Sequence, residues 1–216
     1  KTTTTYTPDG QVATRTGPPS AAAPGGSVWR YSYDLRGRQI SSLDPVKGRT
    51  TTTYDAADQV TSTTDSRGTT LVNRYDALGR RTEVRKGSAS GELVTAWTYD
   101  TIAKGHPTAS TRYVDGNAYA TAITGYDAAY RPLGSTVTVP ASEGGLAGSY
   151  TTSLTYNAAG DVSRMAFPKA GDLPAETVLY GYDPTGDPSS LVGLGSGTYV
   201  NGTTRSSYGE ALQYAM

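Results

Sequence analysis

Short stretches of β-branched and aromatic residues alternate along this chain with clusters of Asp, Gly, Pro and Ser. In stretches such as residues 28–33 and 177–182, apolar or aromatic side chains stand at every second position. Side chains two residues apart point to the same face of a strand, so the pattern predicts β-strands with Trp29, Tyr31 and Tyr33 on one shared face. No segment shows the 3.6-residue apolar period of an amphipathic helix. The alternation therefore predicts an all-β chain.

These stretches end in a Tyr-Asp phrase that predicts a tight turn. In Tyr33-Asp34-Leu35-Arg36-Gly37, the Asp is first and the Gly is fourth in the turn. An Asp side chain accepts hydrogen bonds from backbone N–H groups two or three residues on, and Gly tolerates a positive φ. A short strand at 39–43 and a second turn at 44–48 follow, so one repeat is about one β-hairpin. The spare residues of the longer copies are predicted to be loops, at 17–26, 88–91, 141–145 and 168–174.

The Tyr-Asp phrase returns along the whole chain at steps of 21 to 30 residues. Self-similarity at such a period indicates a repeat architecture, and we interpret residues 1–216 as one array of about eight repeats. The copies begin at Tyr6, Tyr33, Tyr54, Tyr75, Tyr99, Tyr126, Tyr156 and Tyr182, with a further one expected at Tyr208. The residues assigned a structural role in the repeat are Tyr33, Asp34, Gly37, Tyr54, Asp55, Tyr75, Asp76, Gly79, Tyr99, Asp100, Tyr126, Asp127, Tyr156, Gly160, Tyr182, Asp183 and Gly186.

The composition suits strands but offers few apolar residues for a core. Val, Ile, Leu and Phe make up about 14% of the chain, below the roughly 20% that, with high net charge, indicates disorder. The formal net charge is +0, and 17 Tyr and many Thr favour strand surfaces. That charge gives no indication of a nucleic-acid or membrane-surface partner, and no apolar run approaches the roughly 18 residues of a membrane span. No signal peptide is visible, and we interpret the chain as a segment of a longer protein.

The pattern Tyr-Asp-x-x-Gly-Arg, a short strand and then Asp-x-x-Gly resembles the tyrosine–aspartate (YD) repeats of bacterial Rhs proteins, toxin-complex shells and animal teneurins. The clearest copies are 33–38 and 75–80, and the resemblance covers essentially the whole chain. It implies a long, twisted and curled antiparallel sheet of tandem hairpins that forms part of a hollow shell wall. In the bacterial members the shell encloses a toxic C-terminal domain. The resemblance therefore implies two partners, the remaining repeats and the enclosed toxin domain of the same parent chain, and a secreted or cell-surface location.

The resemblance also implies a self-cleaving terminal core, but no stretch here is similar to it, so no catalytic residue is assigned. His106 is the only histidine and there is no Cys, so a Ser-His-Asp site or a zinc site would depend on His106. Its position beside Gly105, in the slot that holds Arg38 and Arg80 in other copies, favours a surface turn. The Gly-rich stretch 192–197 lacks the Lys and the following helix of a phosphate-binding loop and favours a hairpin turn. We expect no enzyme activity, no cofactor and no metal.

Two repeated features have alternative functional interpretations. The turn aspartates would form a row along one sheet edge, where holding the turns is favoured over calcium sites, since those need a denser ligand cluster. The Tyr and Trp ladder favours packing between strands, although an exposed ladder would bind sugars or a partner. The leading function is a structural one, as part of a toxin-encapsulating shell. The alternative is a cell-surface glycan-binding or adhesion module that uses Tyr and Trp faces such as Trp97 and Tyr99.

Overall fold

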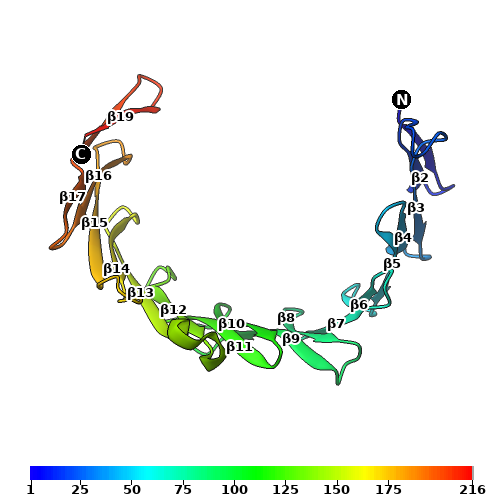
Figure 1. The fold of residues 1–216 in the computed structure, drawn as a ribbon, viewed down its shortest axis with the longest axis horizontal. Helices are drawn as coiled ribbons and strands as arrows, with labels where there is room; N and C mark the ends of the chain where they lie inside the picture. Colours follow the sequence, from blue (N-terminus) through cyan, green and yellow to red (C-terminus); the bar gives the residue numbers. More distant parts are fainter. Residues whose placement is uncertain (216) are drawn as a thin grey trace. The chain divides into compact units, whose positions relative to one another are not determined.

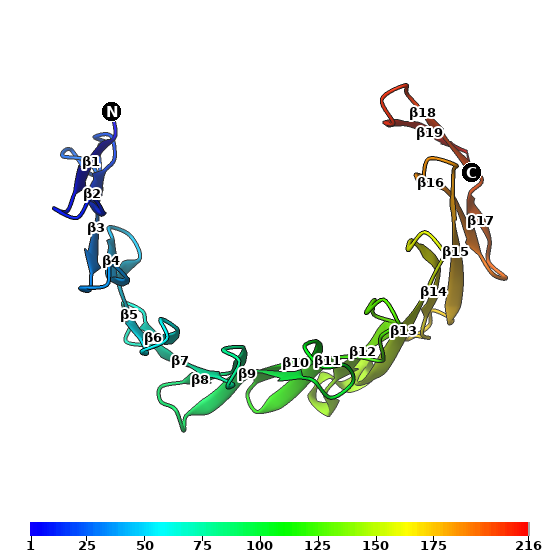
Figure 2. The same cartoon turned by 180° about the vertical axis from the view of Figure 1, so that it is seen from behind.

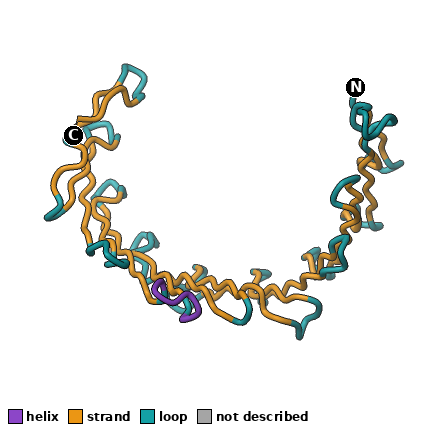
Figure 3. Tube along the Cα trace, in the orientation of Figure 1, coloured by secondary structure: helices purple, strands orange, loops and turns teal. Residues whose placement is uncertain are grey.

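The computed structural model describes residues 1–215, and Met216 lies outside the described residues. Strands and turns make up nearly all of the chain (Figure 3). The chain divides into two compact units, residues 1–96 and 97–216, and each is described by itself. The all-β class predicted from the alternation of side chains is confirmed.

In the first unit, each strand pairs antiparallel with the next strand along the chain (Figure 1). Consecutive hairpins of this kind form a meander, as the repeated turn signals predicted. The strands are β1 (Thr3–Tyr6), β2 (Val12–Thr16), β3 (Val28–Tyr33), β4 (Gln39–Asp44), β5 (Gly48–Tyr54), β6 (Val60–Thr64), β7 (Thr70–Tyr75), β8 (Arg81–Lys86) and β9 (Glu92–Tyr99), the last of which extends into the second unit.

The second unit repeats the pattern from β10 to β17, with neighbouring strands again antiparallel (Figure 2). The Gly-rich stretch forms the turn between its last two strands, where Gly193 pairs with Gly197, as predicted. A separate two-stranded sheet follows. The strands are β10 (Pro107–Val114), β11 (Asn117–Ile123), β12 (Gly134–Val139), β13 (Gly148–Tyr156), β14 (Val162–Phe167), β15 (Glu176–Tyr182), β16 (Pro188–Gly193), β17 (Gly197–Val200), β18 (Gly202–Arg205) and β19 (Ala211–Ala215).

The motif tyrosines mark a one-residue irregularity in the strand pairing. Ser32 pairs with Ser41 but Tyr33 pairs with Gln39, so Ile40 is an extra residue on the returning strand. Such a bulge increases the local twist and re-aims the neighbouring side chains. The same shift occurs at Tyr6, Tyr54, Tyr75, Tyr156 and Tyr182.

The sheet of each unit has no enclosed core among the described residues. Among the described residues the buried hydrophobic side chains are Val84 and Val178, at 8% and 6% exposure, and the motif tyrosines from Tyr33 to Tyr182 are half-buried. The tyrosine ladder therefore packs along one sheet face, and no second layer seals it from solvent. Contacts between neighbouring repeats must supply the stability that a core provides elsewhere.

A short 3₁₀ helix, η1 (Ala141–Leu146), lies where residues 141–145 were predicted to be a loop (Figure 3). It begins after Pro140 and is interrupted at Gly144, whose φ of 56° and ψ of −118° are not helical. Because η1 consists of two short 3₁₀ pieces joined at the non-helical Gly144, it gives no 3.6-residue pattern that the sequence could have revealed.

The expected last copy at Tyr208 is wrong in register. The N–H of Glu210 donates to Oγ of Ser206 at 3.2 Å, and Gly209 has a φ of 82°. Ser206 therefore holds the Asp slot, Arg205 holds the Tyr slot, and Tyr208 is a turn residue that is 90% exposed.

Candidate functional site

The Asp side chain holds each Tyr-Asp turn. Oδ1 of Asp34 accepts hydrogen bonds from the N–H groups of Arg36 at 2.9 Å and Arg38 at 3.0 Å. Gly37, with a φ of 80°, donates its N–H to the carbonyl of Asp34 at 2.9 Å. The same pair of Asp-accepted bonds occurs at Asp55, Asp76, Asp127 and Asp183. Glycines with positive φ close the turns at Gly79, Gly160 and Gly186.

Two copies hold their turns by a variant of this arrangement. Asn157 replaces the Asp, and its Oδ1 accepts the N–H of Asp161 at 2.9 Å, so an amide oxygen does the same work. Asp100 begins a longer turn, in which its carboxylate accepts the N–H of Gly105 at 2.6 Å and its own N–H donates to the carbonyl of His106. The turn aspartates are thus engaged with their own backbone.

The residue after the turn glycine braces one repeat against the next. The guanidinium of Arg38 bonds Asp34 at 2.7 Å, reaches the carbonyl of Asp55 at 3.0 Å and lies 4.7 Å from the ring centre of Tyr54. Where Gln holds this slot, its amide donates to the next turn: Gln59 bonds the carbonyl of Gly79 at 3.3 Å. Arg131 repeats the arginine geometry, with Asp127 at 2.7 Å and the Tyr156 ring at 4.4 Å.

The motif tyrosines act as struts to the preceding repeat. The hydroxyl of Tyr54 donates to the carbonyl of Gln39 at 2.9 Å, which lies at the start of the returning strand one repeat earlier. Because the ring spans the strand spacing and its hydroxyl satisfies a backbone acceptor, phenylalanine could not replace it fully. The other struts join Tyr33 to Val12, Tyr75 to Val60, Tyr126 to Pro107, Tyr156 to Pro132 and Tyr182 to Val162, over 2.6 to 3.0 Å.

Sequence reasoning assigned these tyrosines to a shared face but missed the bond that each hydroxyl makes. A signal was present, since the chain has 17 Tyr and a single Phe. If the rings served packing alone, Phe would serve as well. The excess of Tyr therefore indicates that the hydroxyl is used.

Two copies place a residue other than Gly in the left-handed turn position. Asp58 has a φ of 63° and bonds Arg36 at 3.1 Å and Arg38 at 2.6 Å. Tyr130 has a φ of 60°. Left-handed backbone is unfavourable for these residues, and at Asp58 the ion pairs offset part of that cost.

His106 lies at the end of the Asp100 turn, as predicted, and its ring also packs against neighbouring aromatic rings. It occupies the predicted slot, but its ring is half-buried and stacks on Tyr130, with 4.6 Å between ring centres and 8° between planes. The ring of Tyr126 lies 5.0 Å away. His106 thus contacts the next motif tyrosine, as Arg38 contacts Tyr54.

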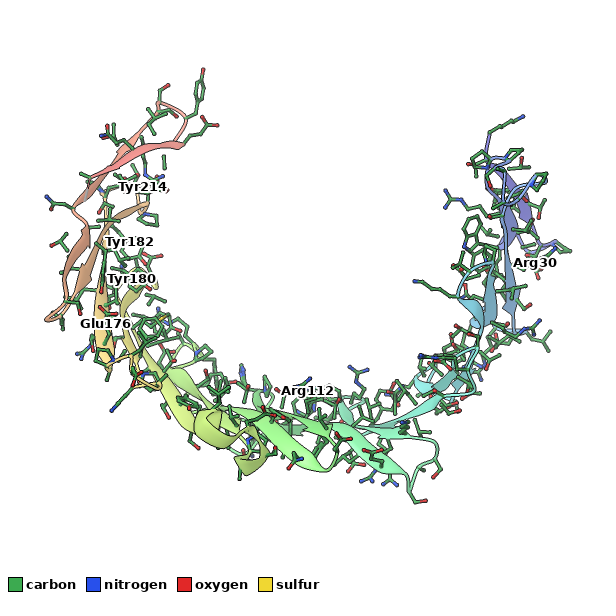
Figure 4. The ribbon with its side chains drawn as sticks, viewed as in Figure 1. Arg30, Arg112, Glu176, Tyr180, Tyr182 and Tyr214 are labelled. Carbon is green, nitrogen blue, oxygen red and sulfur yellow. The ribbon has the colours of Figure 1, made fainter. Side chains whose placement is uncertain are left out.

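Beyond the turns, the second unit carries an open groove, which we call the aromatic groove. It comprises two adjoining cavities of about 700 and 580 Å³ that share Tyr150 and Ala170. Figure 4 shows Glu176, which lines it, on β15 together with Tyr180 and Tyr182. Tyr182 is the strut at the turn end of this strand, so the groove lies at the opposite strand end.

Tyrosine–carboxylate pairs flank the aromatic groove. The hydroxyl of Tyr119 donates to Glu143 in one cavity, and that of Tyr199 donates to Glu176 in the other. The bonds from Tyr199 and Ser196 hold the pKa of Glu176 below its ordinary value, so this carboxylate is ionised at neutral pH. The hydrogen bond to Glu143 raises the pKa of Tyr119, and the hydrogen bond to Glu176 raises the pKa of Tyr199.

No group of three or more His, Cys, Asp or Glu side chains that could hold a metal ion occurs within residues 1–215. In the same range, no helix has the length and apolar character needed to cross a membrane.

Comparisons with known proteins agree with the geometry of the turns. Residues 54–92, which contain the copies at Tyr54 and Tyr75, match the family model of the RHS Repeat. The resemblance stated from the Tyr-Asp phrase is confirmed. No curated protein matches the sequence.

Solved structures show the same fold along nearly the whole chain. A TcdB2-TccC3-TEV crystal structure is similar over 99% of this chain, with a TM-score of 0.66 and 15% identity. A TcdB2-TccC3 structure gives a TM-score of 0.62, and the Tc holotoxin pore of Photorhabdus luminescens gives 0.60, both at 15% identity over 99% of this chain. This chain spans only 12 to 13% of those chains. At this identity the likeness establishes the all-β repeat fold.

Proposed function

We propose that this chain is a structural segment of an Rhs-type toxin shell wall and has no catalytic role of its own. The observation that carries the proposal is the strut from one repeat to the preceding one, made by Tyr hydroxyls in both units. The side chains that make these contacts are spread along the array of repeats and do not converge on one reaction centre. The RHS repeat at 54–92 and the fold shared with TcdB2-TccC3 support the same function.

In this proposal the partners are further repeats and a polypeptide enclosed by the same parent protein, which is secreted or presented at the cell surface. A Thr- and Tyr-rich sheet offers a largely polar surface to an enclosed chain. Because the struts engage the hydroxyls of six motif tyrosines, those hydroxyls do not donate hydrogen bonds to the enclosed chain.

Electron cryomicroscopy of the full-length parent protein tests the proposal. We expect a closed lumen that contains additional polypeptide, and that polypeptide should resist protease in the intact protein. A parent protein imaged as an open ribbon with no lumen would overturn the proposal. So would rapid cleavage of the C-terminal region in a protein whose repeats remain intact.

A matched pair of wall variants sharpens the test. Replacing Tyr33, Tyr54 and Tyr75 by Phe removes three struts while keeping the rings. We expect the enclosed polypeptide to become protease-sensitive at lower denaturant concentration than in the parent. The Tyr208→Phe variant changes an exposed turn residue and should behave as the parent does.

A further inference from the structure

The aromatic groove exposes large apolar side chains to solvent, in a chain that has few of them. Leu173 and Leu146 are 72% and 68% exposed, and Phe167 and Tyr199 are each 41% exposed. The two cavities, about 700 and 580 Å³, fall within the roughly 300–1,000 Å³ of ligand-binding pockets. Clustered apolar side chains in a recess indicate a binding surface more than scattered ones do.

The tyrosine hydroxyls of the groove already donate hydrogen bonds within the chain, and this restricts the kind of ligand that the groove can bind. The hydroxyl of Tyr150 donates to the carbonyl of Leu146 at 3.0 Å, and those of Tyr119 and Tyr199 donate to carboxylates. These three hydroxyls are therefore engaged as donors inside the chain, which leaves ring faces, aliphatic groups and the carboxylates of Glu143 and Glu176 for a ligand. A sugar, which needs several hydrogen-bonding partners, is disfavoured by this arrangement.

The charge of the groove is anionic. Glu143 and Glu176 line it, and the one arginine in its lining, Arg112, lies 4.9 Å from the ring centre of Tyr119. Carboxylates beside an apolar floor complement a side chain with an apolar stem and a cationic end, which are the properties of Lys and Arg.

We propose that the aromatic groove binds an extended polypeptide segment in which large apolar residues are interspersed with Lys or Arg. The apolar side chains occupy the recess beside Phe167 and Leu173, and the cationic groups pair with Glu176 and Glu143. This surface exists whether or not the chain forms a shell. Inside a shell, the enclosed polypeptide would be the natural occupant.

Fluorescence anisotropy with labelled peptides tests the proposal on the chain as it stands. The probes are a short Leu/Lys/Ser peptide, a copy with Glu in place of Lys, and a copy with Ser in place of Leu. We expect the Leu/Lys/Ser peptide to bind at least about tenfold more tightly than either copy. Its affinity should fall as salt is raised, because opposite charges are screened.

Matched variants locate the binding. Leu173→Ser and Glu176→Gln should each lower the affinity for the Leu/Lys/Ser peptide by about tenfold. Two control substitutions lie in the other unit: Leu78→Ser changes a turn residue that is 75% exposed, and Glu92→Gln changes an exposed carboxylate. Both should leave the affinity for the Leu/Lys/Ser peptide unchanged within about twofold. Far-ultraviolet circular dichroism establishes that all four variants remain folded.

Equal binding of the basic and acidic peptides would overturn the proposal, as would undiminished binding by both groove variants. Binding of a glycan on an array, lost in Phe167→Ala while the peptide does not bind, would assign the groove to carbohydrate instead. None of these results depends on whether the parent protein has a lumen, so this test and that of the shell can fail separately.

Discussion

At the scale of single residues, four positions of the Tyr-Asp phrase each have a distinct structural role. The Asp holds its own turn, the Gly allows the left-handed backbone, the next residue braces the following turn, and the Tyr hydroxyl reaches the preceding repeat. Three of these four roles are hydrogen-bonding roles. The phrase is therefore a set of polar joints in a sheet without an enclosed core.

Tyr182→Phe tests the strut. It removes the 2.8 Å bond to the carbonyl of Val162 while keeping the half-buried ring. We expect the free energy of unfolding to fall by about 0.5–1.5 kcal/mol, the usual net contribution of such a bond. Urea unfolding followed by circular dichroism measures the change. Tyr208→Phe, at a 90% exposed ring, is the control, and equal effects of the two variants would count against the strut.

Gly79→Ala tests the brace, with Gly68→Ala as its control. The two glycines have φ values of 78° and 79°, so each Ala carries the same backbone cost of about 1–2 kcal/mol. A Cβ at position 79 would lie 2.7 Å from Nε2 of Gln59, whereas one at position 68 meets nothing within 4 Å. Gly79→Ala should therefore cost a further amount of about 0.5–1.5 kcal/mol, from the displaced Gln59 bond.

The Gln59→Ala background isolates that extra cost in thermal or urea unfolding. Without the Gln59 amide, the Ala substitutions at positions 68 and 79 should destabilise the chain equally. A difference that persists in this background would show that something other than the brace distinguishes the two turns.

The sequence predicts what depends on local pattern and misses what depends on the neighbouring repeat. Strands at 28–33 and 177–182 follow from period-two alternation, and the turn at 193–197 follows from its glycines. The struts and braces join residues 15 to 26 positions apart, so their partners appear only once strand register is known. Tyr208 was misplaced because Ser206 takes the Asp slot, where a hydroxyl replaces the carboxylate.

At the scale of elements, the turns are ionic as well as hydrogen-bonded. The Arg38 guanidinium, with backbone N–H groups, holds the pKa of Asp34 below its ordinary value. The N–H groups of Arg80 and Arg131, followed by their guanidinium groups, lower the pKa of Asp76 and Asp127. These pairs remain partly accessible to solvent, so each contributes modestly, and their effect comes from repetition.

The lowered pKa values predict acid sensitivity. A carboxyl group with a lower pKa in the folded state stabilises the fold above its unfolded pKa of about 3.9, and this contribution is lost as pH falls through the folded value. The midpoint temperature of thermal unfolding should therefore decrease as the pH is lowered from about 5 to about 3. Replacing Asp34, Asp76 and Asp127 by Asn should lower the midpoint at neutral pH and flatten this dependence.

Asn157 shows that an amide can hold such a turn, so the triple Asn variant should fold. Asp172→Asn, at an exposed carboxylate of the 168–174 loop, serves as the control. If the triple variant loses as much thermal stability between pH 5 and pH 3 as the control does, the turn carboxylates are not the acid-sensitive groups.

At the scale of the molecule, a sheet without an enclosed core depends on contacts between adjacent repeats. In such an array the stability is close to a sum of repeat terms and nearest-neighbour terms. An array of this kind tolerates the loss of a whole repeat but not of part of one. The step from Tyr54 to Tyr75 is one repeat, since both tyrosines end a strand and begin the same turn.

Deleting residues 54–74 joins Thr53 to Tyr75 and removes two strands, β6 and most of β7. Because an even number of strands is lost, every later strand keeps its direction. The later Tyr-Asp turns then stay on the same side of the sheet as before. We expect a folded chain whose urea m-value is lower by about a tenth, in proportion to the residues removed. Deleting residues 55–64 removes β6 alone, which reverses the direction of the following strands and also removes Val60, the acceptor of the Tyr75 hydroxyl. That shorter deletion should abolish the cooperative transition seen by circular dichroism, because the strut and brace partners no longer meet. If the two deletions unfold alike, the repeat is not the unit that stabilises this sheet.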